Sequence, residues 1–330
     1  MILPEGLKYY LVAVMAGLFA GALAVAGATL SATESTRLRF DSVTLSDPQF
    51  LTGTQGGQPV VIWGDLRLPA PREERFPAVI LIHGSGGVGP HEERWADELT
   101  GIGAATFILD SFSARGIDET AEDQSRLSLG AMIVDAYRAA ELLSTHPQID
   151  AGRIALMGFS RGGYASLYAS LTRFQRLHQR VPLEFAAYVA FYPFCNATFI
   201  GDEQVSDRPI RIFHGAADDY TPIGPCRAYV ERLRQAGKDV QLIEYPGAQH
   251  GFDSPGRVPS LHLPRLVNPS RCFFVEQTPG VVVHRDSGQP VDFKDACFTR
   301  GVTLGYDARA HADATQSVKT LLATVFKRDD

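Results

Sequence analysis

Six short, largely apolar runs recur along the chain between residues 78 and 245. They are Ala78–Ile82, Ala105–Leu109, Ile154–Met157, Ala187–Phe191, Ile210–Phe213 and Val240–Tyr245. Helical patterns lie between most of them, most clearly at Leu129–Ser144, Tyr164–Phe174 and Cys226–Gln235. Apolar strands that alternate with helices predict a parallel sheet whose two faces are both covered by helices.

The segments on either side of this pattern differ from it. Residues 37 to 70 alternate apolar and polar residues around Gly56-Gly57, which predicts two antiparallel strands. A last helix is expected over Ala314–Phe326, with Asp313 as its N-cap. Residues 254–303 are rich in Pro, Gly and polar residues, and we expect an irregular insertion there. We therefore expect a single domain over residues 33–330.

The first 32 residues have the features of a targeting segment. Residues 11 to 30 carry no charge and follow Lys8, and Ala26-Gly27-Ala28 resembles a cleavage site. We favour a cleaved signal peptide and export to the periplasm or the medium. The alternative is an uncleaved membrane anchor, because about twenty apolar residues can span a bilayer.

The expected export bears on the oxidation state of the four cysteines. Cys195, Cys226, Cys272 and Cys297 form an even set without C-x-x-C spacing, so we expect two disulfides and no metal. We favour the pairs Cys195–Cys226 and Cys272–Cys297. Free buried cysteines are the alternative.

The strongest chemical motif is the sequence GFSRGG, which begins at Gly158 and places Ser160 within G-x-S-x-G. It follows an apolar run and precedes a helical pattern. Such a turn holds a nucleophilic serine at a helix N-terminus, and glycines are needed where the backbone is crowded. The alternative is an ordinary tight turn.

A serine nucleophile needs a base and an acid, and both follow apolar runs in the expected order. Asp218 comes after Ile210–Phe213, and His250 comes after Val240–Tyr245. His250 would take the proton of Ser160, and Asp218 would hold the imidazole in one tautomer.

Other residues could be considered for these two roles. Asp219 is the alternative acid, although we expect it to cap the next helix. His214 is expected to be a packed strand residue. Three further histidines lie in or after the insertion, and none follows the last strand as His250 does: His262, His284 and His311.

The sequence GSGGVG from Gly84 to Gly89 matches the G-x-G-x-x-G pattern of dinucleotide-binding turns, and Asp110 lies downstream. In such turns the helix begins within the glycine motif. Here Pro90 would begin it after the motif, and Glu92 and Glu93 would repel a pyrophosphate. We therefore expect no cofactor.

These segments together resemble the dienelactone hydrolase family of α/β-hydrolases. The matching sequences are LIHGSGG, ILDSFSARG, GFSRGGYAS, HGAADDYTP and AQHGFD, over roughly residues 55–253 and the last helix. The resemblance implies an eight-stranded, mostly parallel sheet and hydrolysis of a carboxylic ester through an acyl-enzyme. It also implies an oxyanion hole made by the backbone N–H groups of Ser85 and Arg161.

Two departures separate the chain from the namesake enzymes. They use a cysteine where this chain has Ser160, and they carry a glutamate where it has Gly84. A plain serine triad and a substrate other than dienelactone are therefore expected.

We expect a small-molecule ester as substrate. An acyl-peptide or amide hydrolase is the alternative, and a non-catalytic binding protein is a third class. The formal net charge of −6 and the lack of a basic stripe argue against nucleic acid. Tyr220, Phe159 and Phe112 are candidates for lining the substrate pocket, with a core position as the alternative.

Overall fold

A computed structural model describes residues 35–54, 56–70 and 73–327. Its centre is an eight-stranded sheet with the order β1-β2-β4-β3-β5-β6-β8-β9. The strands are β1 (Ser35–Thr44), β2 (Gln58–Arg67), β3 (Phe76–Ile82), β4 (Ala105–Asp110), β5 (Ile149–Phe159), β6 (Tyr188–Phe191), β8 (Ile210–Gly215) and β9 (Val240–Tyr245). Only the pairings of β2 with β1 and β4 are antiparallel. All six apolar runs lie in this sheet, so the predicted fold class is confirmed.

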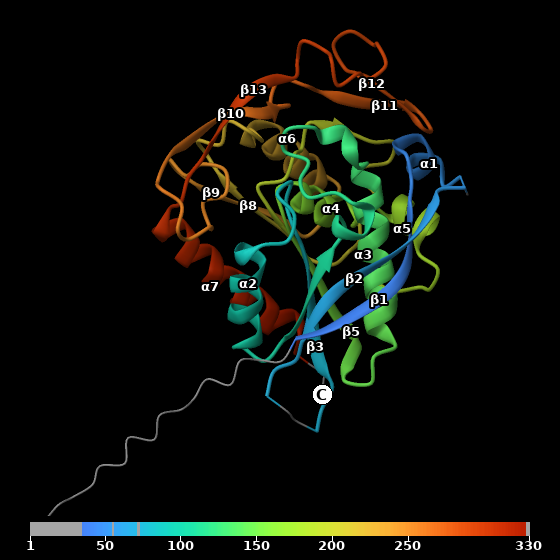
Figure 1. The fold of residues 1–330 in the computed structure, drawn as a ribbon, viewed down its shortest axis with the longest axis vertical. Coiled ribbons are helices and arrows are strands. Elements are labelled where there is room, and N and C mark those ends of the chain that lie inside the picture. The colour runs from blue at the N-terminus through green and yellow to red at the C-terminus, as the bar shows by residue number, and fades with distance from the viewer. Residues whose placement is uncertain (1–34, 55, 71–72, 328–330) are drawn as a thin grey trace, which may run out of the picture. The chain divides into compact units, whose positions relative to one another are not determined.

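Helices cover both faces of the sheet (Figure 1). They are α1 (Asp47–Thr52), α2 (Pro90–Thr100), α3 (Leu129–Ser144), α4 (Arg161–Tyr168), α5 (Thr172–His178), α6 (Ile223–Gln235) and α7 (Ala308–Val325). Along β3, Ile80 and Ile82 pack into the core shared with α3, α4 and α6. Val79 and Leu81 pack into a second core, under α2 and α7. A strand between two cores has no polar face, which explains its unbroken apolar sequence.

Two of the expected helices have different bounds. The pattern Tyr164–Phe174 is not one helix, because the chain leaves α4 after Tyr168 and α5 begins at Thr172. Between them, Leu171 is extended and forms a β-bridge with Val205. Pairing with a neighbouring segment therefore overrides the helical pattern at this point.

The last helix begins six residues earlier than expected, at Ala308 rather than Ala314. Its N-cap is Asp307, whose carboxylate accepts from the N–H groups of Arg309 and Ala310. Asp313 instead accepts a 2.9 Å hydrogen bond from the hydroxyl of Tyr245. The expected N-cap at Asp313 was wrong because another aspartate with the same capping chemistry precedes it.

We expected the insertion over residues 254–303 to be irregular, but it contains regular secondary structure. It contains β10 (Leu261–Asn268), β11 (Phe274–Thr278), β12 (Val281–His284) and β13 (Thr299–Leu304). β10 pairs with β13, and the β11–β12 hairpin extends β7 (Ala197–Thr198). These strands are short and mostly half-buried or exposed, so they lack the alternation that marks a strand in a sequence.

Both expected disulfides are present. Cys195–Cys226 ties the segment after β6 to α6, and Cys272–Cys297 closes the insertion on itself. Two disulfides are typical of an extracellular or periplasmic protein. The expected signal peptide or anchor over residues 1–32 lies outside the described residues. Within the described part of the chain, no helix has the length and apolar character needed to cross a membrane.

Candidate active site

Ser160 lies at the sharp turn between β5 and α4 and has the unusual backbone angles φ 54° and ψ −110°. A side chain at Gly158 would place Cβ 2.0 Å from the carbonyl oxygen of Gly162, and one at Gly162 would place it 2.1 Å from that of Ile82. Only glycine fits these two positions. The motif therefore has the strand–turn–helix geometry that a nucleophilic serine requires.

The structure brings Ser160 together with His250 and Asp218, from three separate segments. Nε2 of His250 lies 2.9 Å from Oγ of Ser160, and Nδ1 lies 2.7 Å from Oδ2 of Asp218. His250 follows β9 and Asp218 follows β8, at the same edge of the sheet as Ser160. This arrangement can pass the serine proton to the imidazole while the carboxylate fixes its tautomer.

The carboxylate of Asp218 is buried and fully hydrogen-bonded. Its Oδ1 accepts from the backbone N–H groups of Tyr220 and Thr221, each at 2.9 Å, and its Oδ2 accepts from the hydroxyl of Thr221 at 3.0 Å. Burial raises the pKa of Asp218, but His250, His214 and the backbone N–H of Thr221 together lower it by more, so the net shift of the pKa is downward. Asp218 is therefore held as the anion.

Asp219, the alternative acid, points elsewhere. Its two oxygens accept from the backbone N–H and the hydroxyl of Thr303, each at 2.7 Å. The N-cap of α6 is Pro222, so the capping role expected for Asp219 was wrong. Instead, Asp219 anchors β13 of the insertion to the loop that carries Asp218.

The other histidines have other partners. His214 is buried in β8, where burial lowers its pKa, and its Nδ1 lies 3.9 Å from Oδ2 of Asp218. His284 hydrogen-bonds with Asp295, and His311 lies 3.3 Å from the hydroxyl of Tyr306. Gly301 of β13 approaches the ring of His262.

The glycine loop, residues 84–89, lies directly against Ser160. A Cβ at Gly84 would lie 3.5 Å from Cβ of Ser160 and 3.3 Å from the carbonyl oxygen of Phe159. Ser85 follows in this loop, and Arg161 is the first residue of α4. Their backbone N–H groups therefore belong to the two segments that flank Ser160.

The helix after the glycine loop begins at Pro90, as expected. Glu92 is buried in its first turn and accepts a 2.9 Å hydrogen bond from the N–H of Gly89. This carboxylate occupies the position that a pyrophosphate would need in a dinucleotide-binding turn.

Sequence reasoning did not identify Gln124, which connects the side chains around Ser160. Its Oε1 accepts from the guanidinium of Arg161 at 2.7 Å. Its amide nitrogen donates to Oγ of Ser85 at 3.3 Å and to the hydroxyl of Tyr220 at 3.1 Å. Gln124 lies in a short 3-10 helix without a motif of its own, so no signal in the sequence marks it.

A second unpredicted feature is a hydrogen-bond network around the buried carboxylate of Asp253, three residues after His250. This carboxylate accepts from the Tyr192 hydroxyl at 2.7 Å, from Nε1 of Trp95 at 2.8 Å and from Nε2 of His91 at 2.9 Å. Burial alone would lower the pKa of His91, but Asp253 and Glu92 raise it to about 9. A charged pair is therefore buried three residues from His250.

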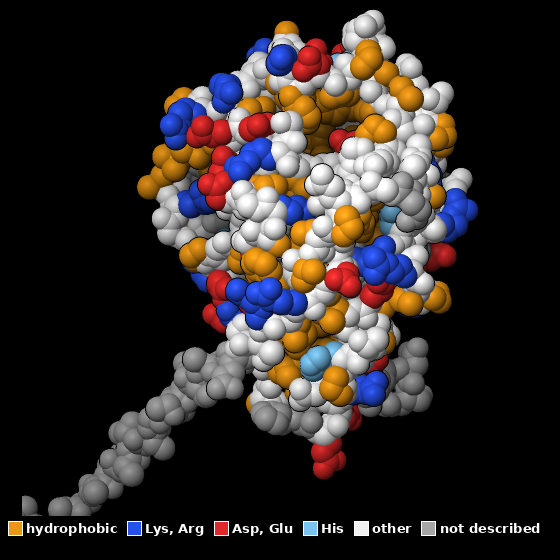
Figure 2. All heavy atoms as spheres, turned by 45° about the vertical axis from the view of Figure 1, so that its right-hand side comes forward, with side chains coloured by type: hydrophobic (Ala, Val, Ile, Leu, Met, Phe, Trp, Pro, Cys, Tyr) orange, Lys and Arg blue, Asp and Glu red, His pale blue; other side chains and the backbone are white. Residues whose placement is uncertain are grey.

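Ser160 opens into a cavity of about 790 Å³. Ser85, Arg161 and Tyr220 also line it, and most of its remaining wall is apolar. Figure 2 shows a hollow bordered by hydrophobic side chains near the top of the molecule, at the end where Figure 1 places β11 and β12. Phe159 and Phe112, the other two lining candidates, are core residues.

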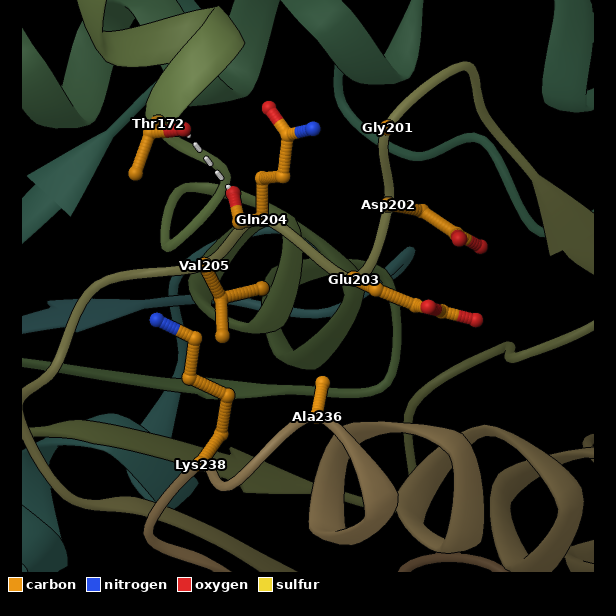
Figure 3. A pocket seen from close by; sticks show the side chains of 8 residues that line it. All are labelled: Thr172, Gly201, Asp202, Glu203, Gln204, Val205, Ala236 and Lys238. Carbon is orange, nitrogen blue, oxygen red and sulfur yellow. Dashed lines mark hydrogen bonds between the residues drawn. The ribbon is translucent and has the colours of Figure 1, made fainter.

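A second hollow, of about 560 Å³, lies between the start of α5, residues 201–205 and the end of α6 (Figure 3). Its charged side chains already have partners. Asp202 pairs with Arg232 at 2.6 Å, and Lys238 pairs with Asp207 at 2.7 Å. Ser160, Asp218 and His250 do not line it. No group of three or more His, Cys, Asp or Glu side chains could hold a metal ion in the described ranges.

Comparison with proteins of known sequence gives distant relatives. The chain is 25% identical to YuxL of Bacillus subtilis, named as an uncharacterized peptidase, over 68% of this chain and 38% of that protein. It is 26% identical to LipM of Mycobacterium tuberculosis, named as a carboxylic ester hydrolase, over 39% of this chain and 40% of LipM. The chain thus spans less than half the length of these relatives.

Two solved structures share the fold. A dienelactone hydrolase-like promiscuous phosphotriesterase from metagenomic libraries aligns with a TM-score of 0.57 at 18% identity, over 89% of this chain and 99% of that one. A Klebsiella pneumoniae protein assigned to the dienelactone hydrolases aligns with a TM-score of 0.54 at 15% identity, over 87% and 99%.

The sequence model of the dienelactone hydrolase family matches residues 65–326. This range includes the turn at Ser160, the loop with Asp218, the loop with His250, and the insertion. The chain therefore belongs to the dienelactone hydrolase family, within the α/β-hydrolases.

Proposed function

We propose that the protein is a serine hydrolase that cleaves a carboxylic ester of a small molecule through an acyl-enzyme. The observation that carries this proposal is the hydrogen-bonded series from Ser160 through His250 to Asp218, with distances of 2.9 and 2.7 Å. Family membership and the name of LipM agree with ester hydrolysis.

In the first half of the reaction, Oγ of Ser160 attacks the ester carbonyl carbon while Nε2 of His250 takes its proton. The N–H groups of Ser85 and Arg161 bind the oxyanion of the tetrahedral intermediate. His250 then gives the proton to the leaving alkoxide oxygen, and the carbon–oxygen bond breaks. The acyl group remains on Ser160, and the alcohol leaves.

In the second half, water attacks the acyl carbon while His250 takes one of its protons. The second tetrahedral intermediate collapses, His250 returns the proton to Oγ of Ser160, and a carboxylic acid leaves. Asp218 stays ionised throughout, which agrees with its lowered pKa, and stabilises the charged imidazole.

A fluorophosphonate probe tests the nucleophile. We expect labelling at Ser160, identified by peptide mass spectrometry, and no labelling of Ser160→Ala. A folded wild-type protein that never labels would contradict the hydrolase proposal and favour a binding protein.

The second candidate is an amide or acyl-peptide hydrolase, favoured by the match to the peptidase YuxL. Parallel assays on p-nitrophenyl esters and aminoacyl anilides separate the two. We expect turnover of the esters, whereas activity on the anilides alone would reverse the assignment.

We further propose that the domain works outside the cytoplasm, in the periplasm or the medium, after cleavage of the N-terminal segment. The two disulfides support this location. N-terminal sequencing of the exported protein tests it, and an intact Met1 in a membrane fraction would favour the anchor.

A further inference from the structure

The cavity next to Ser160 is larger than a short-chain ester needs. Its volume of about 790 Å³ lies in the upper part of the range for pockets that enclose a drug-sized ligand. A substrate such as an acetate ester would leave most of it unfilled. Its size and wall therefore carry information about the substrate.

The insertion forms one side of the cavity wall. Its contribution is almost entirely apolar and includes Phe274, Val281, Val282, Val291, Phe293 and Phe298. Phe50, Leu51 and Phe199 lie in the wall contributed by the rest of the domain. A pocket with such a wall favours the transfer of hydrocarbon out of water.

The charged groups in the wall are Asp47, Arg126 and Arg161, and each already interacts within the protein. Arg161 donates to Gln124 at 2.7 Å, and Arg126 pairs with Asp118 at 2.8 Å. Asp47 accepts a backbone hydrogen bond from Gly130 and lies within electrostatic reach of Arg161. These groups therefore do not require a charged substrate.

The positions of the reacting groups indicate which half of the ester enters the cavity. Its described wall includes Ser160, Ser85 and Arg161, the last two being the proposed oxyanion donors, but it does not include His250. The leaving alkoxide must lie beside His250, because this residue supplies its proton. The group on the other side of the carbonyl is the acyl group.

From these observations we infer that the protein is specific for esters with a large, uncharged, apolar acyl group, which the insertion encloses. This inference rests on the proposed ester hydrolysis and adds the substrate class. Medium-chain acyl esters are its simplest representatives. Each methylene that the cavity buries raises kcat/KM by up to roughly fourfold.

A pair of isomeric esters tests which half is recognised. Ethyl octanoate and octyl acetate have the same atoms and the same overall hydrophobicity, and acid release from both can be followed by pH-stat below their solubility limits. We expect a kcat/KM at least about tenfold higher for ethyl octanoate, since burial of only two methylenes accounts for that factor. Equal rates, or faster octyl acetate hydrolysis, would overturn the inference.

Variants in the insertion test the wall. Val291→Trp fills part of the cavity, and Phe293→Ser removes an apolar wall residue whose side chain is 46% exposed, so folding should tolerate the change. The ratio of kcat/KM for p-nitrophenyl octanoate over p-nitrophenyl acetate should fall at least about threefold in each. Val258→Ser is the matched control: Val258 lies in the same insertion, is 53% exposed and does not line the cavity.

The two proposals can fail separately. Wild-type protein that hydrolyses neither p-nitrophenyl ester and is not labelled by a fluorophosphonate contradicts the proposed function itself. Wild-type protein that hydrolyses the acetate at least as well as the octanoate supports ester hydrolysis and overturns only the acyl specificity. A ratio unchanged in both wall variants also overturns it.

Discussion

The hydroxyl of Tyr192 donates a 2.7 Å hydrogen bond to Oδ1 of Asp253, and the ring of Tyr192 lies against the imidazole of His250, with ring centroids 4.5 Å apart. The backbone of Tyr192 has a positive φ of 37°, which is rare for a residue other than glycine. Its carbonyl oxygen lies 3.1 Å from the hydroxyl of Thr221, which shares its single proton between this oxygen and Oδ2 of Asp218. Tyr192 thus connects Asp253 to His250 and to Thr221, whose hydroxyl also contacts Asp218.

Tyr192→Phe removes only the hydroxyl, and the buried carboxylate then loses one of its three donors. We expect the free energy of unfolding to fall by about 1.5–3 kcal/mol, the cost of a hydrogen bond to a charged group. Urea denaturation measures this loss. Tyr245→Phe is the control, because its hydroxyl bonds to the exposed Asp313; an equal loss in both variants would contradict a special role for Tyr192.

The stability of the fold should depend on pH through His91. Its folded-state pKa of about 9 lies above the ordinary value of 6.5, so its stabilising effect is complete below pH 6.5 and is lost as pH rises through 9. The shift corresponds to roughly 3 kcal/mol over this window. Urea denaturation from pH 6.5 to pH 9.5 should show a decline in wild type. In His91→Gln the decline should be much weaker, and parallel curves would contradict the assignment.

Asp218→Asn and Asp219→Asn form a matched pair for the identity of the acid. Asn at 218 would leave the imidazole in the wrong tautomer, and kcat should fall by about 10⁴. Both described hydrogen bonds of the Asp219 carboxylate come from Thr303 of the insertion, so its variant should lose far less activity. The assay is p-nitrophenyl ester hydrolysis, and a larger loss in Asp219→Asn would reassign the acid.

Removal of the disulfide Cys272–Cys297 should loosen the insertion. A disulfide that joins residues with a sequence separation of 25 stabilises the folded protein by about 3 kcal/mol relative to the unfolded chain. In the Cys272→Ala/Cys297→Ala variant we expect faster tryptic cleavage at Arg285 and Lys294, detected by mass spectrometry. Val258→Ser, which keeps the bond, provides the reference rate, and unchanged cleavage would contradict the prediction.

The sequence alone predicts the central sheet and the positions of Ser160, Asp218 and His250. Each depends on a local signal: an apolar run, or a polar residue placed directly after one. The turn at Ser160 is the clearest example. A Cβ at Gly158 or Gly162 would lie only 2.0 or 2.1 Å from a backbone oxygen, so this turn requires glycine at both positions. Such contacts impose residue types that remain visible in the sequence.

The unpredicted features depend on contacts between distant segments. Asp253 meets Trp95 and His91 across more than 150 positions, and nothing in the local sequence marks these pairs. The strands of the insertion are similar: besides forming a hairpin with β12, β11 pairs with β7, which lies 77 residues earlier in the sequence. The N-cap of α7 at Asp307 was missed for another reason, because Asp307 and Asp313 are both suited to the same capping role.

The bond between Asp219 and Thr303 has an evolutionary consequence. Ser160, Asp218 and His250, the proposed reacting groups, follow strands of the central sheet, whereas the insertion's part of the cavity wall comes from one continuous stretch that returns to the loop beside Asp218. Mutation or exchange of that stretch could therefore retune the choice of substrate while the reacting groups stay in place. Homologous proteins could therefore differ in substrate specificity while they keep the attachment of the insertion at Asp219.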